Sequence, residues 1–235
     1  MASRTLLYVT QVAPYRHGPA GVHGVLDQSA AAFSQLAESA GLDFRRVHDV
    51  RDLDVSVLVS ARAVVLFTIG ETPWSRDQRA ALVKGVRAGT TSVVAVHSAT
   101  DSCHGWAEYG SLVGARFDGH PWTQRCTLDV SDRAHPAVAH LGPTWDWRDE
   151  VYRFRDLRPD AHVLLRAREG ELDPEAASDE LPPPFGYPLS WCFTEGDGRV
   201  FSTSLGHFPH AWETPDYLRH LAGGLEWSMQ TTRTG

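Results

Sequence analysis

Long apolar runs, dense basic clusters and paired cysteines are all missing from this chain of 235 residues. A bilayer-spanning helix needs about 20 consecutive apolar residues, and no stretch of the sequence supplies them. The first residues also lack the extended hydrophobic segment and the small-residue cleavage site of a secretion signal. The sequence therefore predicts a cytoplasmic protein without a membrane partner.

Charge and cysteine content exclude further classes. The chain has 22 Lys and Arg against 29 Asp and Glu, a formal net charge of −7, and its basic residues are scattered. Nucleic-acid binding needs a concentrated positive surface, so we expect a small-molecule partner instead. Cys103, Cys126 and Cys192 are odd in number and far apart, which indicates reduced thiols and not a disulfide framework or a zinc knuckle.

What is present is the composition of one ordinary globular domain, which we assign to residues 1–235. Hydrophobic residues make up 42% of the chain and charged residues 22%, without a stretch that reads as a linker. In the first half, apolar runs typical of strands alternate with helical patterns: strands over 5–10, 42–47, 63–68 and 92–96, and helices over 22–40 and 76–88. This order predicts an α/β fold with a mostly parallel sheet and helices on both faces.

The second half changes character after Cys126. Short strand-like pieces follow one another without long helical periods, which predicts antiparallel additions to the sheet. An acidic, proline-rich segment over 169–184 is expected to be an exposed loop that could act as a lid. The predicted elements are strands over 126–130, 150–154 and 162–166, a hairpin of 189–193 and 200–205 around the turn 195–198, and a last helix opening at Thr214 and Pro215 with Leu218, Leu221 and Leu225 inward.

The best candidate for a functional centre is His97. It directly follows Ser92–Val96, which reads as a buried strand, and small polar residues come next. Ligands of open α/β sheets bind beyond the carboxyl ends of the strands, so a side chain there is well placed for chemistry. His207 stands in the same relation to the strand over 200–205. A purely structural role for His97, bonding to a backbone carbonyl, remains an open alternative.

Aromatic and polar side chains are dense after His97. Rings stack on the apolar faces of sugars and carboxylates accept hydrogen bonds from hydroxyls, so a polyhydroxylated ligand is indicated. The candidates for binding it are His17, Trp106, Tyr109, His120 and Trp122. For Trp106, Tyr109 and Leu112 we favour a different interpretation, the buried stripe of a short helix. For His120 we favour a functional role.

Taken in order along the chain, eight motifs resemble the ThuA-like family of trehalose utilisation, which is similar to class I glutamine amidotransferases. The motifs are Phe67–Gly70, Val96–Asp101, Glu108–Gly110, Gly119–Trp122, His135–Pro136, Asp149–Tyr152, Ser190–Cys192, and Gly198–Phe201 continuing through Leu205–His207. The resemblance implies a flavodoxin-like α/β fold and a link to carbohydrate metabolism.

The sequence departs from the amidotransferase pattern at the residue that matches their nucleophile. His97 stands where amidotransferases have a nucleophilic cysteine, and His207 matches the place of their catalytic histidine. Without a thiol at that turn a covalent thioester cannot form, so amidotransferase activity is not expected. Cys103 lies six residues further on, beyond the turn.

Our leading hypothesis is an enzyme that transfers protons on a keto-sugar or glycoside. His97 and His207 would act as general acid and base, with Glu150 or Asp101 orienting a ring or accepting a substrate hydroxyl. The family resemblance points to 3-keto sugars, whose carbonyl makes the adjacent C–H acidic. Abstraction of that proton gives an enediol, which leads to isomerisation or to elimination or hydrolysis of a glycosidic group.

Two other hypotheses use the same residues differently. His17, His97, His120 and His207, with Glu150, could bind Zn²⁺ or a similar divalent ion, although no HExxH motif is present. No cofactor is otherwise indicated.

The third hypothesis is a noncatalytic sugar-binding or assembly protein on a degenerate amidotransferase scaffold, with exposed tryptophans available for a homodimer. An enzyme should bring His97, His120, His207 and a carboxylate into one pocket. A noncatalytic binding protein should leave at least two of these four groups far from the others.

Overall fold

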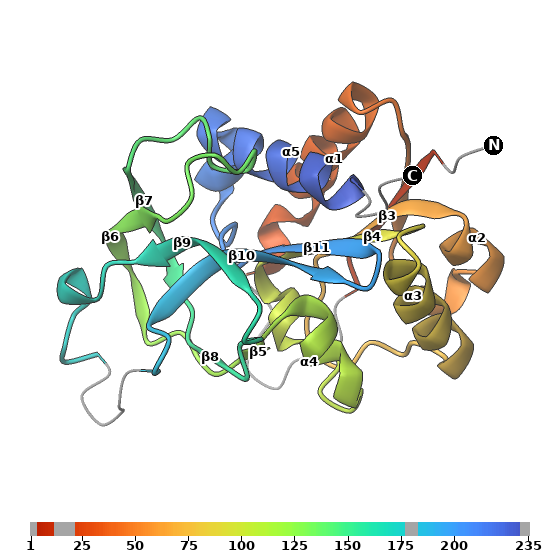
Figure 1. Cartoon of the computed structure of the whole chain (residues 1–235), viewed down its shortest axis with the longest axis horizontal. Helices are drawn as coiled ribbons and strands as arrows, with labels where there is room; N and C mark the ends of the chain where they lie inside the picture. Colours follow the sequence, from red (N-terminus) through yellow and green to blue (C-terminus); the bar gives the residue numbers. More distant parts are fainter. Residues whose placement is uncertain (1–3, 12–21, 177–182, 231–235) are drawn as a thin grey trace.

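The centre of the computed structural model is one nine-stranded sheet in the order β2-β1-β3-β4-β11-β10-β9-β6-β7 (Figure 1). The structure describes residues 4–11, 22–176 and 183–230, so the candidate His17 lies outside the described residues. The strands of this sheet are β1 (Thr5–Val9), β2 (Asp43–Val47), β3 (Ala61–Leu66), β4 (Ser92–Val96), β6 (Trp122–Val130), β7 (Thr144–Val151), β9 (His162–Ala167), β10 (Tyr187–Glu195) and β11 (Gly198–Thr203). A separate two-stranded ribbon pairs β5 (Arg116–Phe117) with β8 (Phe154–Arg155).

One half of the sheet is parallel and sandwiched between helices. β2, β1, β3, β4 and β11 pair in parallel. Helices α1 (Leu26–Ser39) and α5 (Pro215–Met229) pack on one face, and α3 (Arg76–Arg87) and α4 (Ala107–Val113) on the other (Figure 1). Every residue of β4 is buried, as its uninterrupted apolar sequence predicts for a central parallel strand. The expected α/β fold with helices on both faces is confirmed.

The other half is antiparallel and forms the left side of the view in Figure 1. β10, β9, β6 and β7 pair in antiparallel fashion beyond β11. In the chain, this half lies between β4 and β11, which are themselves parallel neighbours with Val93 opposite Val200. The predicted antiparallel additions in the C-terminal half are therefore confirmed.

Several predicted boundaries were wrong in this half. β7 spans Thr144–Val151, not 150–154, and β6 begins at Trp122, not Cys126. Exposed polar or charged residues stand between the buried ones along most of both strands, so apolar runs are a poor guide to them. The short helix α2 (Val55–Val59) was not predicted. At α3, Ser75 and Gln78 form the predicted capping box.

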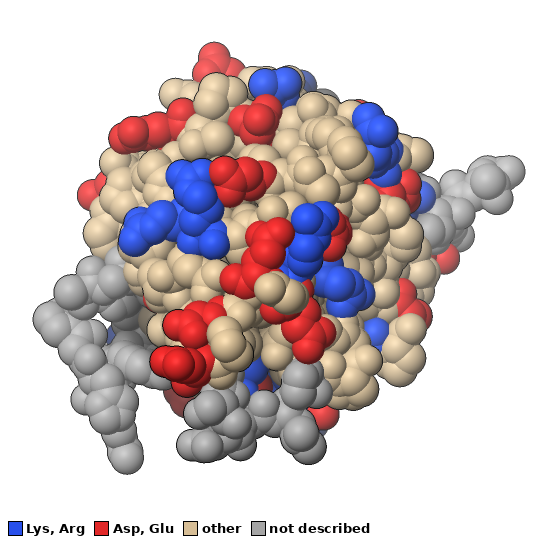
Figure 2. Space-filling view, turned by 90° about the vertical axis from the view of Figure 1, so that its left-hand side faces the viewer, with Lys and Arg blue, Asp and Glu red and all other residues tan. Residues whose placement is uncertain are grey.

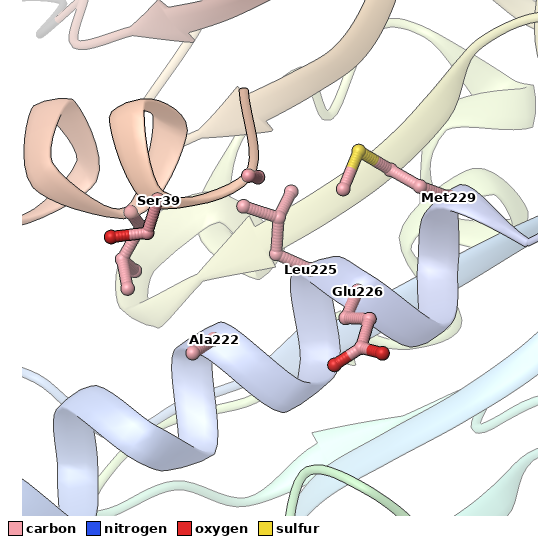
Figure 3. A pocket seen from close by; sticks show the side chains of 7 residues that line it. Ser39, Ala222, Leu225, Glu226 and Met229 are labelled. Carbon is pink, nitrogen blue, oxygen red and sulfur yellow. The ribbon is translucent and has the colours of Figure 1, made fainter. Parts of the chain in front are cut away.

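Two surface features are separate from the strand ends. On the side viewed in Figure 2, acidic and basic side chains are interspersed, and ion pairs such as Arg125–Asp146, at 2.6 Å, join neighbouring strands. A hollow between α1 and α5 is lined by Leu36, Ser39, Ala40, Ala222, Leu225, Glu226 and Met229 (Figure 3). Among the described residues, no helix has the length and apolarity to cross a bilayer.

Gly114, just after α4, is a position where an added side chain should destabilise the fold. Its φ is 96°, and a Cβ there would lie 2.3 Å from Nε1 of the fully buried Trp191. Left-handed strain and overpacking together should cost Gly114→Ala about 2–5 kcal/mol of unfolding free energy in urea titrations. Gly170→Ala, with no atom within 4 Å, is the matched control and should change stability little. Equal stabilities of the two variants would contradict the close packing around Gly114.

Candidate functional site

β4 ends in a turn with unusual backbone geometry at His97. Its φ is 49°, a left-handed conformation that non-glycine residues seldom adopt, and a 3-10 helix over His97–Asp101 follows. Such a conformation costs on the order of 1–3 kcal/mol and persists only where the surrounding structure holds it. This turn brings the imidazole of His97 into contact with Ser204, the residue that follows the neighbouring strand β11.

Both nitrogens of His97 have protein partners. Nδ1 lies 2.8 Å from the carbonyl oxygen of Ser204, which can only accept, so Nδ1 carries the proton and donates. Nε2 is then the acceptor, and it lies 3.1 Å from the hydroxyl of Tyr152 and 3.2 Å from Nδ1 of His207. Complete burial lowers the pKa of His97, although the charges of Asp149 and Glu150 oppose this. His97 is therefore a neutral acceptor.

Glu150 and His207 form the charged pair of the site. Oε2 of Glu150 lies 3.2 Å from Nδ1 of His207 and 3.7 Å from Nε2 of His97. Burial lowers the pKa of His207, but the hydrogen bond to Glu150 and the charges of Glu150 and Asp149 outweigh it, so the net shift is upward. Burial raises the pKa of Glu150, and the hydrogen bond from His207 with the nearby histidines more than reverses this. The arrangement favours a carboxylate beside an imidazolium.

The side chains of the site differ in the fraction of their surface that is exposed to solvent. The side chain of His97 is 0% exposed, that of Glu150 10%, that of His207 14% and that of His120 44%. His120 stacks on Tyr152 with ring centroids 5.7 Å apart, and its Nδ1 lies 3.8 Å from Oε1 of Glu150. Solvent therefore reaches part of Glu150, His207 and His120, whereas His97 is fully buried. The ring of His97 also has three partners, Ser204, Tyr152 and His207, so its predicted role as a general acid or base stays a prediction.

The other described candidates are all buried. Asp101 is buried, with Oδ1 2.9 Å from Nε2 of His104, and its charge contributes to the raised pKa of Tyr152, of which burial is the main cause. Trp106, Tyr109 and Trp122 are buried in the core. Their burial agrees with the packing interpretation of Trp106 and Tyr109 and leaves little ring surface for stacking on a sugar.

Polar atoms of these buried rings are occupied as well. The hydroxyl of Tyr109 donates to the carbonyl of Ala99 at 3.0 Å, and Nε1 of Trp122 donates to the carbonyl of Asp173 at 2.8 Å. Hydrogen bonds of this kind are typical of structural aromatic residues.

Two residues near the pair were not singled out from the sequence. Asp149 accepts hydrogen bonds from the backbone N–H groups of Gly206 and His207, at 2.8 and 3.3 Å, and Tyr152 donates to His97. The sequence did hold one signal, the adjacent carboxylates Asp149 and Glu150 near the end of β7. In an alternating strand one of two adjacent side chains faces the protein interior, where a carboxylate is uncommon.

A metal ion has a suitable set of ligands here. His97 Nε2, Glu150 Oε2 and His207 Nδ1 are separated by 3.2, 3.2 and 3.7 Å. Ligand atoms bound tetrahedrally to zinc at about 2.0–2.1 Å are about 3.3 Å apart, so the spacing fits. Two histidines and one carboxylate are also a known iron-binding combination. All three belong to the predicted set of His17, His97, His120, His207 and Glu150, of which His120 is not part of this group and His17 lies outside the described residues.

The three cysteines do not provide a nucleophile. All are buried, and burial raises the pKa of Cys192 to about 12 and that of Cys126 to about 11. Burial likewise raises the pKa of Cys103, whose Sγ lies 2.9 Å from the hydroxyl of Thr72. Thiolates are therefore disfavoured at neutral pH, and none of these side chains stands at the turn after β4.

A family model described as trehalose utilisation, ThuA, matches residues 13–228. The chain belongs to the ThuA family. The match spans both halves of the sheet and includes every described residue of the site. Membership in the ThuA family connects the protein to carbohydrate-related functions, and no curated protein matches the chain.

Solved structures agree on the fold. A ThuA-like protein of Parabacteroides merdae superposes with a TM-score of 0.71 at 20% identity, covering 98% of this chain and 93% of its own. One from Bacteroides uniformis has a TM-score of 0.72 at 17% identity, covering 97% and 92%. The cytoplasmic protein STM3548 of Salmonella typhimurium has a TM-score of 0.61 at 10% identity, covering 95% and 98%. At these identities the likeness extends to the fold of ThuA-family proteins and no further.

Proposed function

We propose that this ThuA-family protein is an enzyme that moves a proton next to the carbonyl of a keto-sugar or keto-glycoside. The observation that carries the proposal is the contact between Glu150 Oε2 and His207 Nδ1, 3.2 Å long, in a place that solvent reaches. A carboxylate and an imidazolium side by side are a base and an acid of opposite protonation, which enolisation requires. The three histidines His97, His120 and His207 also lie within 4 Å of Glu150, as expected of an enzyme and not of a noncatalytic binding protein.

The proposed reaction begins at the C–H adjacent to the carbonyl. Oε2 of Glu150 faces His207, while Oε1 lies on the side of His120 and accepts the proton from carbon. In the part of the chain that the structure describes, Nε2 of His207 has no hydrogen-bond partner, and it gives its proton to the carbonyl oxygen. The C–H electron pair becomes the C=C bond of an enediol.

The enediol has two outcomes that return the proton. Reprotonation at the former carbonyl carbon gives an isomeric keto-sugar, whereas expulsion of a glycosidic oxygen from the neighbouring carbon gives elimination, with the leaving oxygen taking a proton. His97 and Tyr152 do not touch the substrate in this scheme. They hold His207 through the 3.2 Å contact between His97 Nε2 and His207 Nδ1.

Hydrogen exchange with solvent tests the proton transfer independently of which outcome follows. In D₂O, the protein should catalyse deuterium incorporation next to the carbonyl of a 3-keto-glycoside, followed by NMR. His207→Asn should slow this incorporation at least tenfold, since general acid catalysis contributes roughly 10²–10⁴-fold. His48→Asn, at an exposed histidine, is the matched control and should retain the rate. Binding of keto-sugars without incorporation of deuterium would identify a noncatalytic sugar-binding protein and refute the proposal.

The spacing of His97, Glu150 and His207 favours a second candidate, metal-assisted enolisation. A divalent ion held by these three residues would supply Lewis-acid stabilisation of an enediolate. Elemental analysis of untagged protein separates the candidates. Near-stoichiometric zinc, manganese or nickel that is lost in His97→Ala and His207→Ala would favour the metal-assisted reaction, and metal content unchanged by these substitutions would count against it.

A further inference from the structure

The turn that carries His207 is held by side chains at each of its four residues. The contacts are Ser204 O with His97 Nδ1 at 2.8 Å, Leu205 O with Tyr217 Oη at 2.9 Å, Gly206 O with Trp212 Nε1 at 3.0 Å, and the N–H groups of Gly206 and His207 with Asp149 at 2.8 and 3.3 Å. Three of these side chains pair with carbonyls. Of these four side chains, only that of Asp149 accepts hydrogen bonds from N–H groups of the turn.

Asp149 is buried and its two oxygens accept four hydrogen bonds. Oδ2 accepts from Gly206 N and from Nε1 of Trp147 at 3.1 Å, and Oδ1 accepts from His207 N and from Glu150 N at 2.9 Å. Hydrogen bonds to an ionised acceptor are about twice as strong as neutral ones. A buried N–H group left without an acceptor costs about 1–3 kcal/mol, so losing this carboxylate would release the turn.

The neighbouring Gly206 shows how closely the turn is fitted. Its φ is 118°, and a Cβ there would lie 2.4 Å from the hydroxyl of Tyr217 and 3.2 Å from Trp212. The backbone can take this path only as glycine, and glycine alone does not fix a single conformation. The conformation must therefore be held by external contacts, of which those from Asp149 lie nearest the imidazole of His207.

We infer that Asp149 is a positioning residue: by binding the backbone of Gly206 and His207 it keeps the imidazole of His207 within hydrogen-bond reach of Glu150. Asp149 and Glu150 are consecutive residues at the end of β7. Asp149 binds the backbone N–H of His207, and Glu150 binds its imidazole ring. The effect on turnover rests on the proposed function, whereas the effect on the geometry of His207 does not.

The inference is tested with Asp149→Asn, which keeps the size of the side chain but turns one acceptor into a donor facing N–H groups. In ¹⁵N-histidine-labelled protein, the Nδ1–H resonance of His207, sheltered by its bond to Glu150 in the parent, should broaden into exchange with water. Turnover of the keto-sugar should fall about 10²-fold in kcat, with KM changed less than threefold, because misplacing a catalytic group by about 1 Å has that effect. Asp146→Asn, at an exposed carboxylate of the same strand, is the control for both measurements.

The outcomes separate the inference from the proposed function. A sheltered Nδ1–H resonance in folded Asp149→Asn overturns the inference, whatever the activity. Loss of the resonance with kcat unchanged supports the positioning of His207 by Asp149 and contradicts the proposed role of the Glu150–His207 pair in turnover. If the parent protein has no activity, the resonance alone decides. If Asp149→Asn does not fold, hydrogen exchange of the parent decides: the Gly206 and His207 amides should be protected nearly to the level of global unfolding, and rapid exchange there contradicts the inference.

Discussion

Glu150→Gln is expected to lower the rate of proton exchange on a keto-sugar by 10²–10⁴-fold while leaving the protein folded. Glutamine matches the shape of glutamate but cannot take a proton from carbon, and loss of a general base has an effect of roughly this size. It also removes the carboxylate that raises the pKa of His207. Fewer molecules would then carry the imidazolium at neutral pH, so the acid is weakened together with the base.

Deuterium incorporation in D₂O, measured over a range of pH, checks this prediction. Glu226→Gln, at an exposed position of α5, is the matched control and should behave as the parent protein does. In the variant, the residual activity should also decline at a lower pH than in the parent, because the pKa of His207 falls. A folded Glu150→Gln protein with full activity would show that another group abstracts the proton.

Stability is expected to fall as the pH drops below about 6.5, because buried histidines, His135 and His220 among them, are neutral in the folded protein. Burial lowers the pKa of His220 to about 3, and burial likewise lowers that of His135 to about 4. In the unfolded chain both titrate near 6.5. The unfolded state therefore binds more protons between these values, and the folded state loses stability progressively as the pH falls through that window.

His220 gives the clearest test, since it is fully buried between the carbonyl of Ala137 at 2.9 Å and the hydroxyl of Thr203 at 3.3 Å. By pH 4 its protonation in the unfolded state should cost on the order of 3 kcal/mol. Urea unfolding at pH 7 and at pH 4.5 should show a smaller loss in His220→Gln than in the parent protein. An equal loss in both would mean that His220 does not contribute. Replacing the exposed His48 should leave the pH dependence unchanged.

The convergence of His97 and His207 could be predicted from the sequence because of how parallel sheets are built. Both residues follow buried strands, and the carboxyl ends of parallel neighbours such as β4 and β11 meet at one edge. The place of Glu150 could not be derived this way, since β7 lies at the far end of the strand order. It came from the family resemblance, which holds information about long-range packing that local patterns do not contain.

Burial was the other property that the sequence left open. His97 was predicted at the catalytic centre, but residue type and position cannot say whether a side chain lies at a surface or one layer beneath it. That depends on Tyr152 and His207, which cover it from distant parts of the chain. Asp149 was missed for a related reason: three of its four hydrogen-bond donors are backbone N–H groups, which no side-chain pattern in the sequence marks.

The path of the chain between β4 and β11 determines which segments supply the residues of the candidate site. The chain leaves the parallel half after β4 and re-enters it at the adjacent strand, so everything from β5 to β10 is topologically an insertion. His97 and His207 belong to the host layer, whereas His120 and Glu150 belong to the insert. The candidate site therefore lies where the host layer and the insert meet, and its charged pair forms only when these two segments fold against each other.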